Sequence, residues 1–350
     1  MFERMTVMSK KVLVLGATGA MGRYLSPYLA KMGYTVDGVS LDAAVSTDPR
    51  LKYIQANTKA EGVLDSLLAN NYDCIVDFMI YDRDTFRDVA PKLLGATDHY
   101  IYLSSYRVYA NEEVPIKETS PLLNDILPES EILRGYNDYC LYKARGEKIV
   151  RAWDKKNWTI IRPAITYSLG RYQLATLEAH EVINRTRAGK TILLPDSAMP
   201  VQATMSWAGD VAKMIASLVC NEKALGETYT VSTSEHHTWL EIAEYYKELI
   251  GLKYEIIPTE DYIDVWAGPK SPENLARVHA EWQLYFDRCF TRIIDNSKIL
   301  EISGMKQSQL MPLYDGLKLE LEALPKDAEI PFRHLEKTMD AYIAAHKLKN

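Results

Sequence analysis

"KKVLVLGATGAMGRYLSPYLAKMGYTVDGVS", residues 10–40, is the stretch that decides the fold. It contains a run of apolar residues from Val12 to Leu15, a glycine-rich turn, an amphipathic segment to about Met32 and a second apolar run. A continuous apolar run predicts a strand buried on both faces, and the 3.6-residue periodicity that follows predicts a helix. Together they predict a strand–helix–strand unit with parallel strands.

The same alternation continues to about residue 165. We expect strands at 51–55, 74–78, 99–104 and 158–163, and helices at 58–70, 83–95 and 136–154. Short aliphatic strands alternating with helices indicate a parallel sheet covered on both faces. Beyond residue 165 the elements become shorter and mixed. A helix is nonetheless well marked at 238–251, where Thr238 and Glu241 form a capping box and Gly251 closes the segment.

We therefore predict an α/β fold with a Rossmann-like doubly wound parallel sheet and a smaller C-terminal substrate-binding lobe. Residues 1–10 are predicted to be a disordered leader, and residues 11–165 a dinucleotide-binding domain. Residues 166–350 would form mainly the lobe, with some segments returning to the sheet.

The bulk composition favours small-molecule partners. The 350 residues are 47% hydrophobic and 25% charged, with a net charge of −6 and no block of like charges. Such a chain is not drawn to nucleic acid or to a membrane, and no apolar run is long enough to span one. The cysteines form no CxxC pair, which argues against a zinc site and disulfides: Cys74, Cys140, Cys220 and Cys289. We expect a cytoplasmic protein without a bound metal.

The glycine turn is the first candidate binding site. Gly16, Gly19 and Gly22 lie where strand becomes helix, and a phosphate there needs close backbone approach and free N–H donors. We expect the loop to hold a dinucleotide pyrophosphate. Ser40 or Asp42, after the second strand, is the candidate ribose partner. Asp42 favours NAD and Ser40 tolerates the 2′-phosphate of NADP, so we predict NAD with NADP as the alternative; Asp42 also suits a solvated turn.

Three tyrosines precede Lys143 in "GYNDYCLYKARGEK", residues 135–148: Tyr136, Tyr139 and Tyr142. Helical residues four apart lie on one face about 6 Å apart, whereas neighbours diverge by about 100°. Tyr142 therefore points away from Lys143, and Tyr136 lies about 10 Å along the axis. Tyr139 is the tyrosine that the ammonium group can serve. A nearby cation lowers the pKa of a phenol, which aids proton exchange near neutral pH.

A strand places hydroxyl groups near this tyrosine. "HYIYLSSYRVYA", residues 99–110, brings Ser104 and Ser105 to the carboxyl edge of the sheet, where the glycine turn also lies. Ligands of open α/β sheets bind at that edge. This placement favours an active site over a chance Tyr-x-x-x-Lys.

These motifs together resemble the extended short-chain dehydrogenases/reductases, in particular the NAD-dependent epimerase/dehydratase family. The matching segments follow the family's order: GxxGxxG at 16–22, "IQAN" ending at Asn57, "SSYRVY" at 104–109, "YCLYKARGE" at 139–147, "IIRPAITY" at 160–167, and the lobe segments 226–246 and 293–299. The resemblance covers nearly the whole chain.

The resemblance implies roles for individual residues. Ser105 would hydrogen-bond the reacting oxygen, Tyr139 would be the general acid/base, and Lys143 would hold the nicotinamide ribose and lower the tyrosine's pKa. The implied cofactor-binding set is Gly16, Thr18, Gly19, Ala20, Met21, Gly22, Ser40, Asp42, Asn57, Phe78, Tyr139, Lys143 and Pro163.

The chain also departs from the family pattern. Cys140 follows the tyrosine where a small residue is common, and Tyr106-Arg107 replaces the acidic pair that dehydratases use to eliminate water. "VDFMIYD", residues 76–82, lacks the small Ala-Gly motif beside the cofactor. We therefore expect no dehydratase and a nicotinamide pocket of different shape.

Two arginines are candidate substrate ligands. Arg171 follows the strand that enters the lobe and could meet a diphosphate, with a surface salt bridge as the alternative. Arg107 could face substrate or cap a helix. Arg288 and Arg292 are further candidates of this kind. The adjacent His236 and His237 have no third ligand, so we expect them in a surface loop.

These observations predict an NAD(P)-dependent sugar-modifying enzyme, foremost a nucleotide-sugar epimerase that works as a homodimer. The first alternative is a reductase or dehydrogenase with the same three residues. The second is a non-catalytic dinucleotide-binding protein, such as a sensor or an RNA-associated relative, because a fold does not determine a function.

Overall fold

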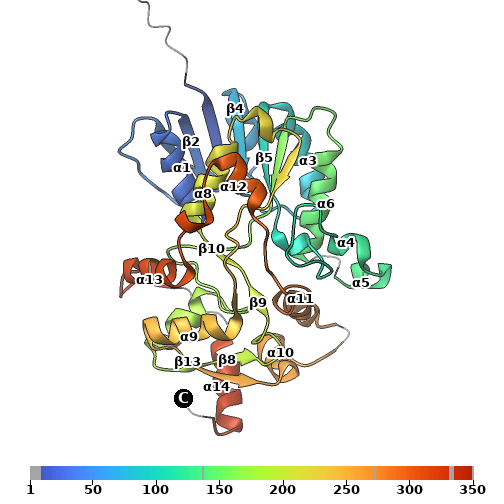
Figure 1. Ribbon diagram of the computed structural model, residues 1–350, viewed down its shortest axis with the longest axis vertical. Coiled ribbons are helices and arrows are strands. Elements are labelled where there is room, and N and C mark those ends of the chain that lie inside the picture. Colours follow the sequence, from blue (N-terminus) through green and yellow to red (C-terminus); the bar gives the residue numbers. More distant parts are fainter. Residues whose placement is uncertain (1–8, 136–137, 272, 331–334, 349–350) are drawn as a thin grey trace, which may run out of the picture.

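The computed structural model describes residues 9–135, 138–271, 273–330 and 335–348. Most of the predicted leader at 1–10 therefore lies outside the described residues. In Figure 1 a large sheet with its helices occupies the upper half, and the shorter elements gather below it. We retain the division at residue 165 as a prediction.

The upper half is built on a parallel sheet of seven strands. Its order is β11-β6-β5-β4-β1-β2-β3. The strands are β1 (Lys11–Leu15), β2 (Thr35–Ser40), β3 (Leu51–Gln55), β4 (Tyr72–Asp77), β5 (Thr97–Leu103), β6 (Trp158–Ile161) and β11 (Glu227–Tyr229). The chain runs outward from β1 to β3 and then returns to β4 on the other side of β1, so β1 and β4 flank the switch point where such folds bind ligands. The predicted fold class is confirmed.

The apolar run of β1 is buried on both faces because helices cover both. Val12 and Val14 pack with helices α1 (Gly22–Lys31), α8 (Ala208–Leu218) and α12 (Ser297–Ser303). Leu13 and Leu15 point the other way, toward α2 (Val63–Leu68), α3 (Arg83–Gly95) and α6 (Tyr139–Arg151). Because α8, α12 and β11 come from beyond residue 165, the later part of the chain completes the sheet layer.

Three predicted elements differ from the structure. The helix expected at 58–70 is α2, which starts only at Val63 because Gly62 before it has a left-handed φ of 73°. The helix expected from 136 begins at Tyr139, where Asp138 caps it, and residues 136–137 lie outside the described ones. The loose segment at 111–134 contains two short helices, α4 (Leu123–Ile126) and α5 (Glu129–Arg134).

The lower half forms a second core. Three two-stranded ladders pair β7 (Ile165–Tyr167) with β10 (Met205–Trp207), β8 (Thr191–Pro195) with β13 (Lys253–Ile257), and β9 (Gln202–Ala203) with β12 (His237–Thr238). Around them lie α7 (Arg185–Arg187), α9 (Trp239–Ile250), α10 (Thr259–Ala267), α11 (Leu275–Gln283), α13 (Leu313–Ala323) and α14 (Leu335–Ala345). The capping box predicted for α9 is confirmed, with Gly251 left-handed at its end.

Short helical turns complete the fold. They are the 3₁₀ turns η1 (Tyr106–Val108), η3 (Glu222–Ala224) and η5 (Gln307–Gln309) and the π-helical turns η2 (His180–Asn184) and η4 (Leu284–Arg288). Of these, η1 and η4 contact each other and contribute residues to the site described below. Among the described residues, every helix is too short or too polar to cross a bilayer.

Candidate active site

A cavity of about 450 Å³ lies at the carboxyl edge of the sheet, against the lower half of the molecule. It is lined by the glycine turn, the ends of β4 and β5, the start of α6 and residues of the lobe. The lining residues are Gly16, Gly19, Ala20, Met21, Phe78, Ile80, Leu103, Ser105, Tyr106, Arg107, Tyr139, Pro163, Ala164, Ile165, Thr166, Arg171, Gln173, Glu178, His279, Gln283 and Arg288. Residues more than 270 positions apart thus share one cavity.

The glycine turn is shaped for a ligand that approaches its backbone. Gly16 has a φ of +83°, and a Cβ there would lie 3.1 Å from the Cβ of Phe78. A Cβ on Gly22 would lie 2.3 Å from the carbonyl oxygen of Gly16, so Gly22 lets α1 pack onto the turn. Within the described residues, the backbone N–H groups of Ala20 and Met21 have no hydrogen-bond partner. Free amides at a helix N-terminus suit the pyrophosphate of a dinucleotide.

The end of β2 is tied to this turn. The Thr18 N–H donates to Ser40 Oγ over 2.9 Å, and the Thr18 hydroxyl donates to Asp42 Oδ2 over 3.2 Å. Ser40 is thus occupied in holding the turn, whereas Asp42 is exposed beside it. Asn57 accepts the N–H of Lys59 in its own turn. None of Thr18, Ser40, Asp42 and Asn57 lines the cavity.

The two serines after β5 point in different directions. Ser105 Oγ accepts the N–H of Arg107 over 3.2 Å, which begins η1, and Ser105 lines the cavity together with Tyr139. Ser104 donates instead to Glu147 Oε1 over 2.5 Å, away from the cavity. Alternation of side chains along the strand explains the split, and it leaves Ser105 facing the site.

Tyr139 is the first residue of α6, and the preceding Asp138 accepts the Cys140 N–H over 2.9 Å. Its ring stacks edge-on against Tyr142 with centroids 5.3 Å apart. Burial raises the pKa of the Tyr139 phenol above its usual value, while Arg171, Arg107 and Ser105 act to lower it. Burial and the nearby cations thus shift this pKa in opposite directions.

Lys143 lies under the site. Its ammonium donates to the Leu103 carbonyl oxygen over 2.6 Å and lies 5.7 Å from the centroid of the Tyr139 ring. Burial lowers the pKa of Lys143 to about 8, opposed by the charges of Asp77 and Glu147. The expected role of Lys143 in lowering the pKa of Tyr139 stays a prediction; burial of the phenol raises this pKa, and the strongest cationic influences on it are Arg171 and Arg107.

Asp77 was not predicted, although it sits at the switch point. This buried carboxylate at the end of β4 accepts the hydroxyl of Tyr100 over 2.8 Å and the N–H of Met79 over 2.9 Å. Burial raises the pKa of Asp77, and Lys143 is the cation that lowers it. A buried carboxyl at the end of an otherwise apolar strand was the available signal.

The last residue of "YCLYKARGE" and the arginine of "IIRP" form one buried ion pair. Arg162 Nε lies 2.8 Å from Glu147 Oε1, and Arg162 Nη2 lies 2.6 Å from Glu147 Oε2. Both side chains are about 2% exposed. The pair joins α6 to the end of β6 and so fixes the position of this helix on the sheet.

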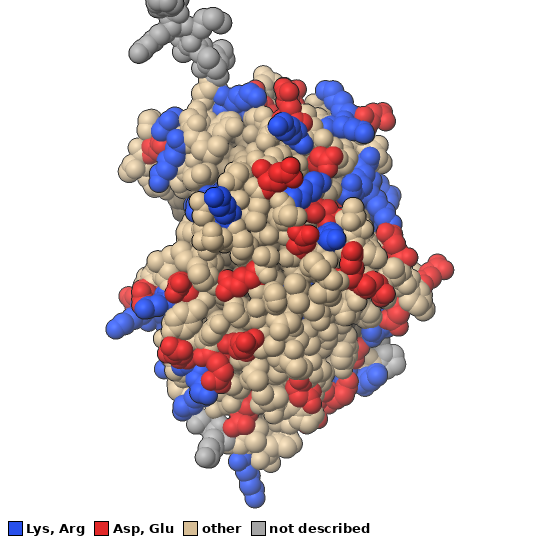
Figure 2. Space-filling model, in the orientation of Figure 1, with Lys and Arg blue, Asp and Glu red and all other residues tan. Residues whose placement is uncertain are grey.

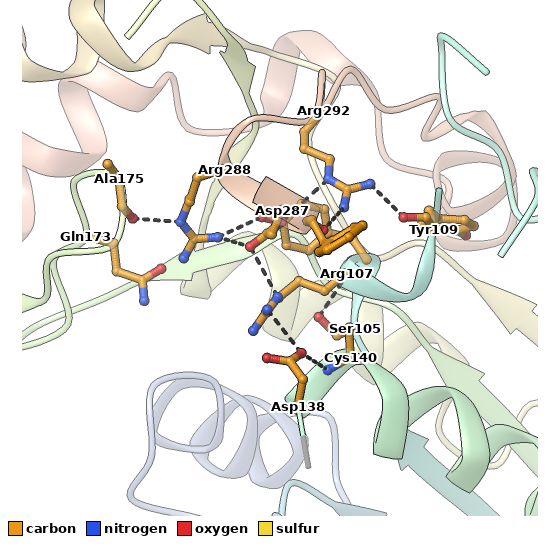
Figure 3. Close-up of polar contacts among 12 residues, drawn as sticks. Ser105, Arg107, Tyr109, Asp138, Cys140, Gln173, Ala175, Asp287, Arg288 and Arg292 are labelled. Carbon is orange, nitrogen blue, oxygen red and sulfur yellow. Dashed lines mark hydrogen bonds and ion pairs between the residues drawn. The ribbon is translucent and has the colours of Figure 1, made fainter. Parts of the chain in front are cut away.

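Arginines and aspartates form a cluster beside the serine (Figure 3). Arg107 Nη2 lies 3.3 Å from Asp138 Oδ1, and Arg107 Nε lies 3.2 Å from Asp287 Oδ2. Asp287 also pairs with Arg288 and, over 3.5 Å, with Arg292. All five side chains are buried. Asp287 was missed because its partner Arg107 is far away in sequence; its charge within the aromatic stretch "LYFDRCF" was the one local signal.

The candidate arginines fall into two groups, those that line the cavity and those that do not. Arg107, Arg171 and Arg288 line the cavity, with Arg171 exposed. Arg292 does not line it: the side chain donates to the Tyr109 carbonyl oxygen over 3.1 Å. His279, which was not predicted, lies 3.5 Å from Asp138 and lines the cavity from α11.

Within the described parts of the chain, no cluster of His, Cys, Asp or Glu is arranged to hold a metal ion. His237 Nε2 lies 2.8 Å from Glu235 Oε1, and His236 Nδ1 lies 3.0 Å from the Ser234 carbonyl oxygen. The two imidazoles thus have separate local partners.

Comparison with solved structures places the fold. The chain resembles UDP-glucuronic acid 4-epimerase from Bacillus cereus, solved with UDP-glucuronic acid and NAD, at 18% identity and a TM-score of 0.65, covering 89% of this chain and 98% of that one. It also resembles UDP-N-acetylglucosamine 4-epimerase from Bacillus cereus at 16% identity and a TM-score of 0.64, covering 92% and 99% of the two chains. At such identities these structures establish the shared fold.

Among curated proteins, the chain matches the chloroplast stem-loop binding protein of 41 kDa b from Arabidopsis thaliana. The two are 27% identical over 248 residues, which cover 66% of this chain and 60% of that protein. The match thus spans less than two thirds of the relative's length.

The sequence profile of the NAD dependent epimerase/dehydratase family matches residues 12–232, from β1 to just beyond β11. The matched region contains the glycine turn, Ser105, Tyr139, Lys143 and the Glu147–Arg162 pair. It covers most of the chain, and the fold and cavity agree with it. The chain therefore belongs to the NAD dependent epimerase/dehydratase family.

Proposed function

We propose that this protein is a nucleotide-sugar epimerase in which Ser105, Tyr139 and Lys143 form the reactive site. Family membership makes it an NAD-dependent enzyme. The observation that carries the proposal is that Ser105 and Tyr139 both line the cavity that also contains the glycine turn. A hydroxyl and a phenol that line one cavity beside a dinucleotide site can bind one alcohol oxygen and move its proton.

The residues fit the cofactor. The free amides of Ala20 and Met21 would hold the pyrophosphate, and Phe78 and Pro163 line the cavity where the nicotinamide end would lie. Bound NAD supplies a hydride acceptor and donor. Tyr139 would take the proton of a sugar hydroxyl while Ser105 holds its oxygen, and would return the proton after the sugar ring has turned. Lys143 would release the Leu103 carbonyl to bind the ribose hydroxyls.

The acidic pair that eliminates water in dehydratases is replaced in this chain. At the positions where dehydratases of this family carry an acidic pair, Tyr106 is buried and hydrogen-bonds with Arg288, and Arg107 is cationic. Neither can act as the base that elimination needs. A reductase remains the first alternative, since it differs from an epimerase only in releasing its cofactor.

The curated relative raises RNA binding as a second candidate, because its name describes a stem-loop binding protein. RNA recognition depends on clustered basic groups that neutralise phosphates. This chain has a net charge of −6, and on the face in Figure 2 the Lys and Arg side chains lie among Asp and Glu. The charge distribution thus favours the enzyme.

The test is to purify the protein, measure its bound NAD by release and absorbance, and follow a panel of UDP- and dTDP-sugars by chromatography. Conversion of a sugar to its epimer without net NADH formation is the expected result. Net stoichiometric oxidation or reduction would indicate the dehydrogenase instead. Tight binding of a structured RNA by a protein that neither holds NAD nor converts any sugar would overturn the proposal.

Asp42 is expected to set the choice between NAD and NADP. Its exposed carboxylate, held by Thr18 at the end of β2, would accept a ribose hydroxyl and repel a 2′-phosphate. Replacing Asp42 with alanine should weaken NAD binding by about 10-fold and leave NADP binding equal or stronger. Equilibrium titration of cofactor-free protein with both dinucleotides measures this, with Asp48→Ala as a control on the following loop. An unchanged NAD/NADP ratio would assign Asp42 to the turn alone.

A homodimer and a cytoplasmic location remain predictions. Sedimentation velocity at several concentrations would test the first, and fractionation of the source cells the second.

A further inference from the structure

We infer that the substrate carries an anionic group, a carboxylate on the reacting sugar ring, and that Arg107 binds it. This inference rests on the proposed function and narrows its substrate class to sugar acids. It starts from the charge balance of the cluster in Figure 3.

The cluster has an excess of positive charge in a buried place. Three guanidinium groups, those of Arg107, Arg288 and Arg292, face two carboxylates, those of Asp138 and Asp287, which leaves one net positive charge (3 − 2 = 1). These side chains are between 1% and 8% exposed. An uncompensated buried charge is unfavourable, and an anion from a ligand would neutralise it.

Of the two cluster arginines that line the cavity, Arg107 has more unused donors than Arg288, whose Nε and Nη1 donate to Ala175, Tyr106 and Asp287. The Arg107 side chain is 8% exposed, lines the cavity and makes one hydrogen bond among the described residues, from Nη2 to Asp138. Its Nε lies close to Asp287 but makes no hydrogen bond. A guanidinium group has five N–H donors, so most of its capacity remains for a bidentate oxyanion.

Position determines which anion Arg107 can reach. It lies two residues after Ser105 in the same 3₁₀ turn, and its guanidinium carbon is 5.6 Å from the centroid of the Tyr139 ring. A group on Arg107 and an oxygen held by Ser105 and Tyr139 therefore belong to one sugar ring or its direct substituent. Arg171, which is exposed at the cavity, is better placed for the diphosphate.

Two carboxylates from distant elements orient Arg107. Asp138 belongs to the cap of α6 and Asp287 to η4 in the lobe, so the guanidinium group is held from both halves of the molecule. Burying a guanidinium group between two carboxylates costs desolvation free energy, which a surface ion pair would not cost. A cation that is oriented in this way is typical of a site that binds a specific ligand.

The experiment compares two substrates that differ at one carbon, UDP-glucose and UDP-glucuronate, in the NAD-loaded protein. We expect the wild type to prefer the uronate by about 100-fold in kcat/KM. Arg107→Met should lose about 100-fold on the uronate and less than about 3-fold on UDP-glucose, and Arg107→Lys should fall between. Arg187→Met, an exposed arginine of the lobe outside the cavity, is the matched control.

The outcomes show whether Arg107 binds a carboxylate on the sugar ring or the diphosphate. Equal losses on both substrates in Arg107→Met would assign Arg107 to the diphosphate or to folding and overturn the inference, as would a wild type without uronate preference. Binding by calorimetry separates this from the proposed function. Preferential, Arg107-dependent uronate binding without turnover would leave the inference standing while the epimerase proposal fails. Epimerisation without that preference would do the reverse.

Discussion

Replacing Tyr139 with phenylalanine is expected to lower the rate of epimerisation by about 10³-fold while NAD stays bound. The substitution removes one oxygen, the phenol group of a residue that lines the cavity with Ser105 and that would exchange the proton of the sugar hydroxyl. The ring and its edge-on contact with Tyr142 remain, so the fold should not change. Conversion of the best sugar in the panel, measured by chromatography, gives the rate.

Tyr142→Phe is the matched control for this prediction. Tyr142 lies on the same helix, its ring contacts Tyr139, and it does not line the cavity. Its variant should keep the rate within about 3-fold. If Tyr139→Phe retained more than a tenth of the wild-type rate, another group would have to move the proton and the proposed mechanism would be wrong.

The second prediction with a large expected effect concerns the free energy of unfolding. Glu147→Gln should destabilise the protein by about 3–5 kcal/mol, because it leaves the Arg162 guanidinium buried without a counter-charge. Both side chains are about 2% exposed, and the ion pair is bidentate. Chemical denaturation, followed by far-ultraviolet circular dichroism, measures the loss. The control is Lys148→Met in the next position of α6, whose ion pair with Asp125 is exposed and should contribute less than about 1 kcal/mol.

The same pair predicts how stability depends on pH. Hydrogen bonding and the charge of Arg162 lower the folded-state pKa of Glu147 below its ordinary value of 4.5, against the effect of burial. Its stabilising contribution is therefore present above pH 4.5 and is lost as the pH falls toward the lowered pKa. The stability gap between wild type and Glu147→Gln should narrow over that range. A gap that stays constant with pH would mean that the charge of Glu147 does not matter.

Much of the site could be predicted because it is encoded locally. The glycine turn follows from the spacing of Gly16, Gly19 and Gly22 after an apolar run, and helical arithmetic chose Tyr139 among three tyrosines. The structure places Ser105, Tyr139 and the turn in one cavity. Their chemical roles stay predictions until the variants are measured.

Other features could not be predicted because they depend on contacts between distant segments. Asp287 and Arg107 are 180 residues apart in sequence and form an ion pair, which no local periodicity predicts. The pKa of Tyr139 also depends on such contacts: helical spacing located a nearby lysine, whereas burial, which the whole cavity determines, raises this pKa.

The sequence by itself thus determined the parallel sheet, the position of its glycine turn and the order of Ser105, Tyr139 and Lys143. Hydrophobic periodicity and residue spacing are defined within a few helical turns or one strand, so they can be read from the sequence alone. Only the tertiary structure decided which charged groups surround these residues. The Lys143 ammonium donates to the Leu103 carbonyl oxygen at the end of β5, Glu147 pairs with Arg162, and Arg107 lies between Asp138 and Asp287. Electrostatic interactions depend on distance and burial in space, and both are set only when the whole chain has folded.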